Sequence, residues 1–440
     1  MMNNGTIAKA VAPISTAAEK VTPVRVRPLG GCERFFHLYS RTFPVHFCLV
    51  AQIEGALDSN KLGAALEQVR RRHSALRVRI VEDAETGPAF YRVDSPIVLR
   101  AARAEAAADW RGTVERELSL PFDTSPGPLM RATALWASDG TSIILTFHHA
   151  IVDALSGTRI LHDLMRALAG DRLEVLPLRP PLEEIIARVV SIRDFVNGSV
   201  FRAEAVAKND VHAPQASGRP MVNKLSANKL MAKIAIAEWD RNETARLIRS
   251  CKANGTTVHG AICAAAARHL PASDVNAIRM HCPVDLGRFA GIEADCGVFI
   301  GAGSVEIPTA RRKPLWDDAR NVVDSLQGVR SPPQMAAMLQ WIMAELPPTA
   351  DNDQTEAFLA SLPPSSAVVS NLGVLPLAAD YGSLRLKAVW GPAMLTSLPA
   401  DRQTIGVSTF AGQLRMVHQS YEPIPGLLEM IRETLLASCA

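Results

Sequence analysis

The chain has 440 residues, of which 48% are hydrophobic and 21% are charged, and its formal net charge is +3. This composition is globular and excludes a disordered chain, and the near balance of charge excludes a general polyanion partner such as nucleic acid. The length is too great for one ordinary core, so we expect two domains of roughly 150 to 220 residues each.

The seven cysteines are scattered along the chain without a Cys-x-x-Cys pair. Neither a disulfide framework nor a zinc ribbon is therefore indicated, and a reducing cytoplasm is the expected location. Residues 1–25 lack a basic start followed by an unbroken apolar stretch, which predicts a mobile tail and not a secretory signal. No run approaches the roughly 18 consecutive apolar residues of a membrane span, so we expect a soluble monomer.

The first half, residues 26–175, alternates strand and helix patterns and is predicted to be mixed α/β. The basic run 70–73 is interpreted as the solvated end of a helix that Asp58 or Ser59 caps. Hydrophobic periodicity predicts the following order: strand 46–54, helix to residue 72, strand 75–81, helix 113–118, strand 129–136, strand 141–147 and helix 156–168.

Residues 176–228 combine a charged helical stretch with proline-rich and glycine-rich loop patterns, and are interpreted as the connection between the halves. The second half, residues 229–440, includes an alanine-rich helix at 257–269 that is expected to pack centrally. Its other predicted elements are strand 230–237, a helix 240–253 ended by Gly255, strands 276–282, 367–370 and 384–389, and a hairpin of 404–410 with 414–420.

Two adjacent histidines, His148 and His149, lie between the strand 141–147 and the helix 156–168. Side chains of neighbouring residues on a tight turn diverge, so one histidine is expected to face a cleft while the other packs behind it. With an ordinary pKa of about 6.5, a histidine can accept a proton near neutrality and return it. The residues alone do not decide which one is the base. Asp153 can orient an imidazole, but capping the next helix or pairing with a distant arginine is favoured.

Two other interpretations of the histidine pair are weighed against a general base. In one, both are satisfied core residues at a strand end. In the other, two histidines and a carboxylate bind a metal, but adjacent histidines diverge, and His259, His269 and His281 lie in segments predicted to be helix and strand interior. No metal ligand set is therefore expected.

Other catalytic motifs are absent from the sequence. It contains no Gly-x-Ser-x-Gly elbow and no phosphate-binding Gly-x-x-x-x-Gly-Lys, and residues 301–304 lack the third glycine of a dinucleotide loop. Without a nucleophile motif, a lone base favours direct transfer, in which an acceptor is deprotonated as it attacks an activated carbonyl.

Several segments together resemble the condensation-domain superfamily of acyltransferases, whose motif is His-His-x-x-x-Asp-Gly. Here the motif reads HHAIVDA, and similar segments cover about residues 26–435. They are HSALRVRI from His73, PFDTSPGPLMR from Pro121, GTTVHGAICAAAARHL from Gly255, PVDLGRF from Pro283, GVFIGAGSVEI from Gly297 and SNLGVLP from Ser370. The last segment and the length most resemble the stand-alone phthiocerol dimycocerosyl transferase type, which is associated with polyketides and esterifies alcohols.

The resemblance implies an α/β fold of two chloramphenicol-acetyltransferase-like halves that form a V-shaped pseudo-dimer around a central tunnel. It implies that His149 is the general base, with His148 packed beside it, and that Asp153 is a structural residue held by an arginine. Arg288 is the first choice for that arginine and Arg279 the second. Ser370 and Asn371 are implied to line the reaction centre and steady the oxyanion.

The chain departs from the family motif at Ala154, where glycine is usual. A methyl group there either narrows the passage or is absorbed by packing. The Asp-Phe-Gly-Trp-Gly segment of the plant acyltransferases is absent, which disfavours that branch.

The resemblance implies ester formation from a coenzyme A thioester or from the phosphopantetheine thioester of an acyl carrier protein, with no bound cofactor. Amide condensation on acyl or peptidyl carrier proteins is the first alternative, and the absence of attached adenylation or carrier domains disfavours it. A non-catalytic module that docks a carrier protein is the second. The acceptor is expected to be a small alcohol or amine.

Overall fold

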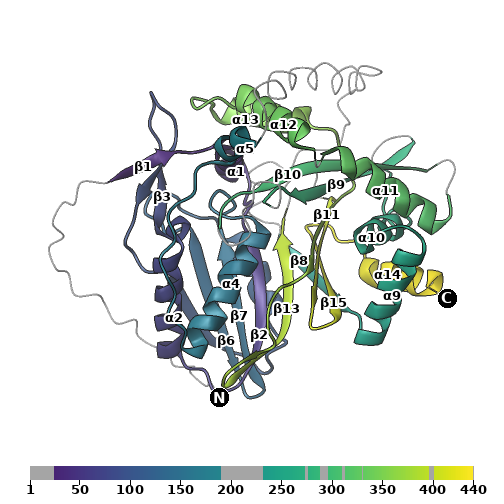
Figure 1. The fold of residues 1–440 in the computed structure, drawn as a ribbon, viewed down its shortest axis with the longest axis horizontal. Coiled ribbons are helices and arrows are strands. Elements are labelled where there is room, and N and C mark those ends of the chain that lie inside the picture. Colours follow the sequence, from purple (N-terminus) through teal and green to yellow (C-terminus); the bar gives the residue numbers. More distant parts are fainter. Residues whose placement is uncertain are drawn as a thin grey trace, which may run out of the picture.

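The computed structural model describes residues 24–189, 231–272, 276–287, 296–309, 313–329, 331–395 and 401–439. Two six-stranded sheets lie side by side with helices packed against them, and a small three-stranded sheet flanks the first (Figure 1). The chain therefore has the predicted mixed α/β architecture of two halves. None of the described helices is both long and apolar enough to cross a membrane.

The first sheet carries the histidine motif at the end of its central strand β7 (Gly140–Phe147). Its order is β12-β13-β2-β7-β6-β5, and β5 (Val98–Arg103) is parallel to β6. The other strands are β2 (Phe47–Glu54), β6 (Met130–Ala137), β12 (Asp380–Tyr381) and β13 (Leu384–Met394). The small sheet has the order β1-β4-β3, with β1 (Arg25–Pro28), β3 (Val78–Val81) and β4 (Ala89–Arg92).

The helices of the first half include α2 (Ser59–Arg72) and α4 (Ala154–Ala169), which pack against each other, and α4 also packs on β2. Asp58 caps α2 as predicted, because its carboxylate accepts a hydrogen bond from the Lys61 N–H at 2.8 Å. Leu62, Leu66 and Val69 of α2 are buried, so the apolar face of this helix closes the first core. The third helix of this region is α3 (Arg111–Ser119).

The second sheet has the order β10-β9-β11-β14-β15-β8, with β11 parallel to both of its neighbours. Its strands are β8 (Lys233–Glu238), β9 (Ala277–Asp285), β10 (Ile300–Pro308), β11 (Ala367–Val374), β14 (Gln403–Phe410) and β15 (Gln413–Ser420). The helices α9 (Arg241–Ala253), α10 (Val258–Ala266), α11 (Leu315–Val329) and α14 (Leu427–Ser438) gather beside it. The alanine-rich α10 is buried and packs against the other three, which confirms its central position.

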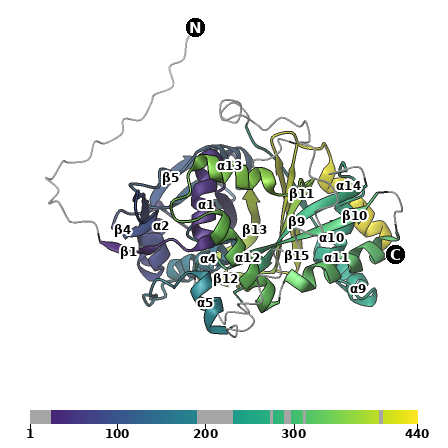
Figure 2. The same cartoon turned by 90° about the horizontal axis from the view of Figure 1, so that it is seen from above.

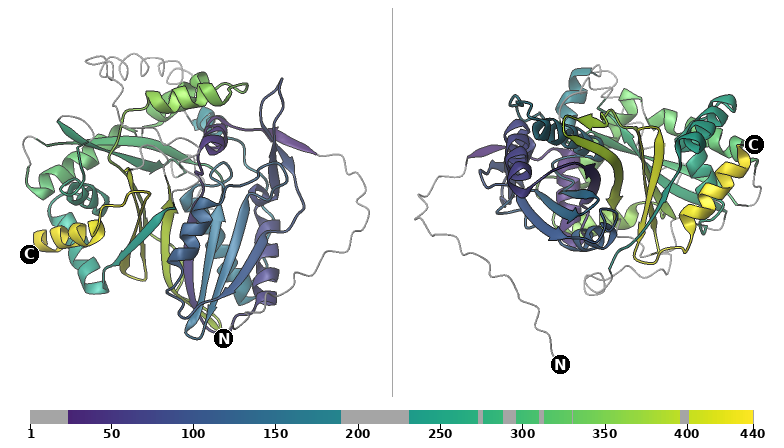
Figure 3. Two further views of the ribbon diagram at one scale, coloured as in Figure 1. Left: turned by 180° about the vertical axis from the view of Figure 1, so that it is seen from behind. Right: turned by 90° about the horizontal axis from the view of Figure 1, so that it is seen from below.

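Each half contributes secondary structure that packs with the other half. The segment from β12 to β13 lies in the second half of the chain, yet β13 pairs with β2 and completes the first sheet (Figure 3). Helix α1 (Gly31–Thr42) belongs to the first half but packs against α12 (Pro332–Glu345) and α13 (Asn352–Ser361), as Figure 2 shows from above. Helix α5 (Leu182–Val189) contacts both α1 and α12. The halves are therefore interlocked and not merely adjacent.

Two local predictions for residues 70–81 are wrong. Residues 75–77 of the predicted strand belong instead to a 3-10 turn of residues 74–77, because Ser74 and His73 anchor the chain to Leu176, and only 78–81 are extended. The basic run is not a solvated helix end either. Arg72 and His73 both bind the Asp163 carboxylate, at 2.5 and 2.9 Å, and His73 is buried.

Candidate active site

The histidine motif forms the connection from β7 to α4. Strand β7 ends at Phe147, the His148 N–H donates to the Leu129 carbonyl at 3.0 Å, and the Ile151 N–H returns to the His148 carbonyl at 3.2 Å. This tight turn separates the two imidazoles, as side chains of adjacent residues should separate. Both residues are buried, with relative exposures of 1% for His148 and 5% for His149.

Both ring nitrogens of His148 are engaged in hydrogen bonds. The Ala150 N–H donates to Nδ1 at 3.1 Å, so Nδ1 is unprotonated. Ser40 Oγ lies 3.1 Å from Nε2 and gives its own proton to the His37 carbonyl, so Nε2 must be the donor. Burial lowers the pKa of His148 well below its usual value. The ring is therefore neutral and fixed in one tautomer.

His149 lies in an apolar stack and keeps one nitrogen unengaged. Its ring is parallel to the Phe36 ring at a centroid distance of 3.9 Å, and the Phe47 ring lies 5.1 Å away. Nδ1 is enclosed beside the residue's own carbonyl and has no other partner among the described residues. Nε2 is not among the fully enclosed atoms and binds no described residue. Desolvation by burial lowers the pKa of His149 to about 4, so the ring is neutral near pH 7.

Asp153 fixes the turn with both carboxylate oxygens. Oδ1 accepts the Ser156 N–H at 2.7 Å and caps α4, while Oδ2 accepts the Phe299 N–H of the second half at 2.8 Å. The Asp153 N–H donates to the Gly297 carbonyl at 2.9 Å. Burial raises the pKa of Asp153, although the hydrogen bonds from the Ser156 and Phe299 N–H groups act to lower it. The motif loop is thus tied to the chain that enters β10.

Replacing Asp153 by alanine is expected to lower the free energy of unfolding by about 2–3 kcal/mol, because a helix cap is lost and the buried Phe299 N–H loses its acceptor. Asparagine has one oxygen and so keeps only one of the two bonds. We expect Asp153→Asn to fall between alanine and the wild type in denaturant-induced unfolding. Equal stability of Asp153→Ala and wild type would contradict this scaffold role.

Arg288 and Arg279 were the two arginines predicted to bind the Asp153 carboxylate. Arg288 lies outside the described residues. Arg279, near the start of β9, is not the partner of Asp153. It binds Glu306 at 2.6 Å and the Pro364 carbonyl at 3.0 Å. In the described part of the chain, backbone N–H groups bind the Asp153 carboxylate.

The side chain of Ala154 contacts the apolar core of the first half. Ala154 is the first residue of α4 and is partly buried against the apolar core of the first half. It takes the glycine position of the family motif at the start of the helix that Asp153 caps.

Ser370 and Asn371 lie on β11 of the second half, opposite Gly406 and Val407 of β14. Asn371 Oδ1 accepts the Gly373 N–H at 2.8 Å, which leaves its NH₂ group as the available donor. No hydrogen bond joins either residue to His148 or His149 within the described ranges. Their part in catalysis stays a prediction.

The residues of α1 that surround the two histidines were not predicted from the sequence. Phe36 stacks on His149, and Ser40, one turn later, binds His148. Arg34 of the same helix is buried and donates to the Leu346 carbonyl of the second half at 2.8 Å. The aromatic run from Phe35 to Tyr39 was the available signal, since it has one apolar face at helical spacing.

The motif residues do not converge on a metal position. Both His148 nitrogens are used, and each Asp153 oxygen binds an amide N–H, so neither residue presents a free ligand beside His149.

A shallow pocket that is open to solvent lies beside the motif loop. Ile151, Gly297 and Phe299 line it together with Arg27 and Glu33, which form an ion pair. Neither His148 nor His149 lines this pocket. It is therefore not the space in which a substrate would meet an imidazole.

Comparison with solved structures places the whole chain in one fold. Polyketide synthase associated protein 5 from Mycobacterium tuberculosis aligns with a TM-score of 0.65 at 17% identity, over 95% of this chain and 99% of its own. Trichothecene 15-O-acetyltransferase from Fusarium sporotrichioides gives 0.69 at 14%, over 96% and 97%. The first condensation domain of the calcium-dependent antibiotic synthetase gives 0.68 at 16%, over 94% and 97%. At such identities the likeness shows the fold alone, a pseudo-dimer.

Two of the sequence relatives are much longer proteins, of which the chain matches only a small part. Phosphinothricin tripeptide synthetase PhsB from Streptomyces viridochromogenes is 29% identical over 190 residues, which are 40% of this chain and 16% of that protein. Nonribosomal peptide synthetase 5 from Gibberella zeae is 30% identical over 130 residues, 28% of this chain and 1% of that protein. The condensation-domain family model matches residues 35–272, which include most of α1 and the histidine motif. The chain therefore belongs to the condensation-domain family.

Proposed function

We propose that the chain is an acyltransferase that moves an acyl group from a coenzyme A or carrier-protein thioester to an alcohol, with His149 as general base and without a covalent intermediate. The observation that carries this proposal is the unequal bonding of the two histidines. His148 has both nitrogens engaged, whereas His149 keeps Nε2 unengaged. Only His149 can therefore accept a proton without breaking an internal hydrogen bond.

The reaction needs one proton to move twice. The acceptor hydroxyl gives its proton to His149 Nε2 as its oxygen forms a bond to the thioester carbonyl. The tetrahedral intermediate then collapses with cleavage of the C–S bond, and the departing thiolate takes the proton from His149. For this, the hydroxyl must lie within roughly 3 Å of Nε2 in the bound complex.

The surrounding residues have supporting roles in this proposal. His148 and Asp153 hold the turn, and Phe36 restricts the His149 ring to one plane. The NH₂ group of Asn371 and the hydroxyl of Ser370 are the donors we assign to the oxyanion. A tunnel between the two halves would bring donor and acceptor to His149 from opposite faces.

The acid limb of the rate profile should lie near pH 4. His149 acts as a base only when neutral, and its lowered pKa of about 4 keeps it neutral through the physiological range. We expect kcat/KM to be constant from about pH 6 to 8 and to fall as the pH decreases through about 4. Initial rates across this range, with circular dichroism at each pH to confirm folding, test the prediction. An acid limb near 6.5, the unperturbed histidine value, would contradict it.

Amide formation is a second candidate, favoured by the peptide synthetases among the sequence relatives. The same base would deprotonate an amine as it attacks the thioester. Incubating the purified chain with acyl-coenzyme A and acyl-carrier thioesters and with matched alcohol and amine acceptors, read by mass spectrometry, separates the two. A predominant ester supports the first proposal, and a predominant amide overturns it in favour of the second. Absence of multiple turnover with every pair would instead support a module that only docks carrier proteins.

A further inference from the structure

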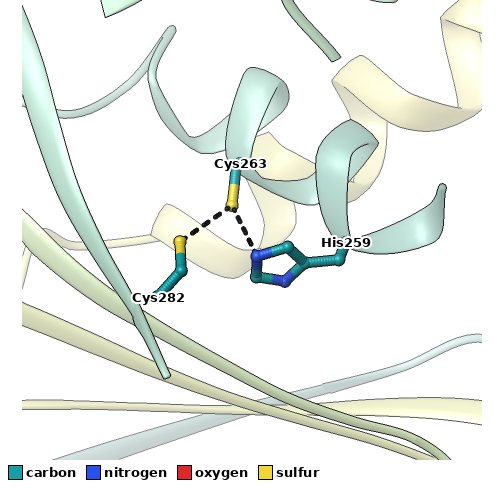
Figure 4. Close-up of side chains that lie close together, drawn as sticks. All are labelled: His259, Cys263 and Cys282. Atoms are coloured by element: carbon teal, nitrogen blue, oxygen red, sulfur yellow. Dashed lines mark hydrogen bonds between the residues drawn. The ribbon is translucent and has the colours of Figure 1, made fainter. Parts of the chain in front are cut away.

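Three potential metal ligands come together in the core of the second half, far along the chain from the histidine motif. His259 and Cys263 lie on α10 and Cys282 lies on β9 (Figure 4). Cys263 Sγ is 3.7 Å from His259 Nε2 and 3.9 Å from Cys282 Sγ. All three ligand atoms lie within 4.8 Å of one another.

The local sequence explains this convergence. His259 and Cys263 are four residues apart, so they lie on the same face of α10. Along β9, residues alternate between partly buried and buried, and Cys282 shares the buried face with Met280 and Val284. Helix α10 thus presents an imidazole and a thiol toward a strand that presents a second thiol.

The distances suit a zinc ion. Two thiolates bound at about 2.3 Å in tetrahedral geometry are about 3.8 Å apart, and a thiolate and an imidazole nitrogen bound at about 2.0 Å are about 3.5 Å apart. The observed separations of 3.9 and 3.7 Å match these values closely. The third pair, His259 Nε2 and Cys282 Sγ, lies within 4.8 Å and must approach to about 3.5 Å, so binding requires a movement of at most roughly 1 Å there.

The chemistry of the surroundings also points to a ligand. Cys263 and Cys282 are fully buried among apolar side chains, and His259, at the first turn of α10, is partly exposed. Soft thiolates with imidazole select zinc over magnesium or calcium.

We propose that His259, Cys263 and Cys282 bind one zinc ion, which joins α10 to β9 and stabilises the core of the second half. Each thiol loses its proton on binding, so two protons are released, and a water molecule completes the tetrahedron. The site lies away from the acyl-transfer residues, and it stands whether or not that activity is confirmed. It also revises the expectation from sequence that the chain has no metal ligands.

The full chain, purified under reducing conditions without chelator, is tested first for zinc by inductively coupled plasma mass spectrometry. We expect about one zinc ion per chain. After removal of zinc with chelator, the thermal midpoint should fall, and zinc but not magnesium should restore it. Cobalt should bind with a thiolate-to-cobalt charge-transfer band, which reports sulfur ligation directly.

Variants locate the site. Cys282→Ser and His259→Gln should lose the bound zinc and the cobalt band, whereas Cys48→Ser, which changes a fully buried cysteine in the first half, should keep both. If a variant fails to fold, the chelator and cobalt experiments on the wild-type chain still test whether the chain binds zinc through thiolates. Absence of stoichiometric zinc together with absence of the thiolate band overturns the proposal.

Discussion

Replacement of His149 by glutamine is expected to reduce turnover by about 10²- to 10⁴-fold, the usual contribution of a positioned general base. Glutamine fills much of the same space between Phe36 and Phe47 but cannot accept a proton near neutral pH. The fold should therefore survive, because the described structure has no hydrogen bond from the His149 ring to another residue. The loss should appear in kcat more than in KM.

The measurement compares steady-state rates and thermal unfolding of the same protein samples. His269→Gln is the matched control, since His269 is a partly buried histidine of the second half that binds Thr434 at 2.8 Å. It should retain nearly full turnover. Full activity of a folded His149→Gln variant would remove His149 from the mechanism.

Replacement of Gly406 by alanine is expected to lower the free energy of unfolding by about 3 kcal/mol or more, the upper end for overpacking a core. Gly406 lies on β14, where the second sheet meets β13 of the first. A methyl group there would overlap the Pro392 carbonyl oxygen and lie 2.9 Å from its carbonyl carbon. Neither peptide can move easily, because Ser408 of β14 also binds the Val389 carbonyl of β13 at 3.0 Å.

Gly63→Ala provides the control for this prediction. Gly63 is inside α2, and an added methyl group would meet nothing within 4 Å. That change should raise the free energy of unfolding by about 0.5–1 kcal/mol, because alanine favours a helix. Denaturant titrations of both variants give the comparison. Similar stabilities for Gly406→Ala and Gly63→Ala would show that the strands separate readily at this point.

The elements that the sequence predicted well are those whose pattern is local. Strand β7, helix α4, the cap at Asp58 and the hairpin through Ala411 and Gly412 follow from periodicity, capping residues and turn residues within a few positions. The 3-10 turn at 74–77 was missed because distant contacts with Leu176 and Asp163 form it. Helix α1 was missed because both halves bury it.

The sequence by itself determined the family through the order of its motifs, the position of the histidine pair between a strand and a helix, and the capping role open to Asp153. Only the tertiary structure decided that Ser40 and Ala150 engage both nitrogens of His148, that Phe36 stacks on His149, and that β13 joins the first sheet. It also brought Cys282 to the α10 face that carries His259 and Cys263. The reason is that periodicity and turn residues report only on neighbours within a few positions. These contacts join residues that are distant in the sequence, so no local pattern predicts them.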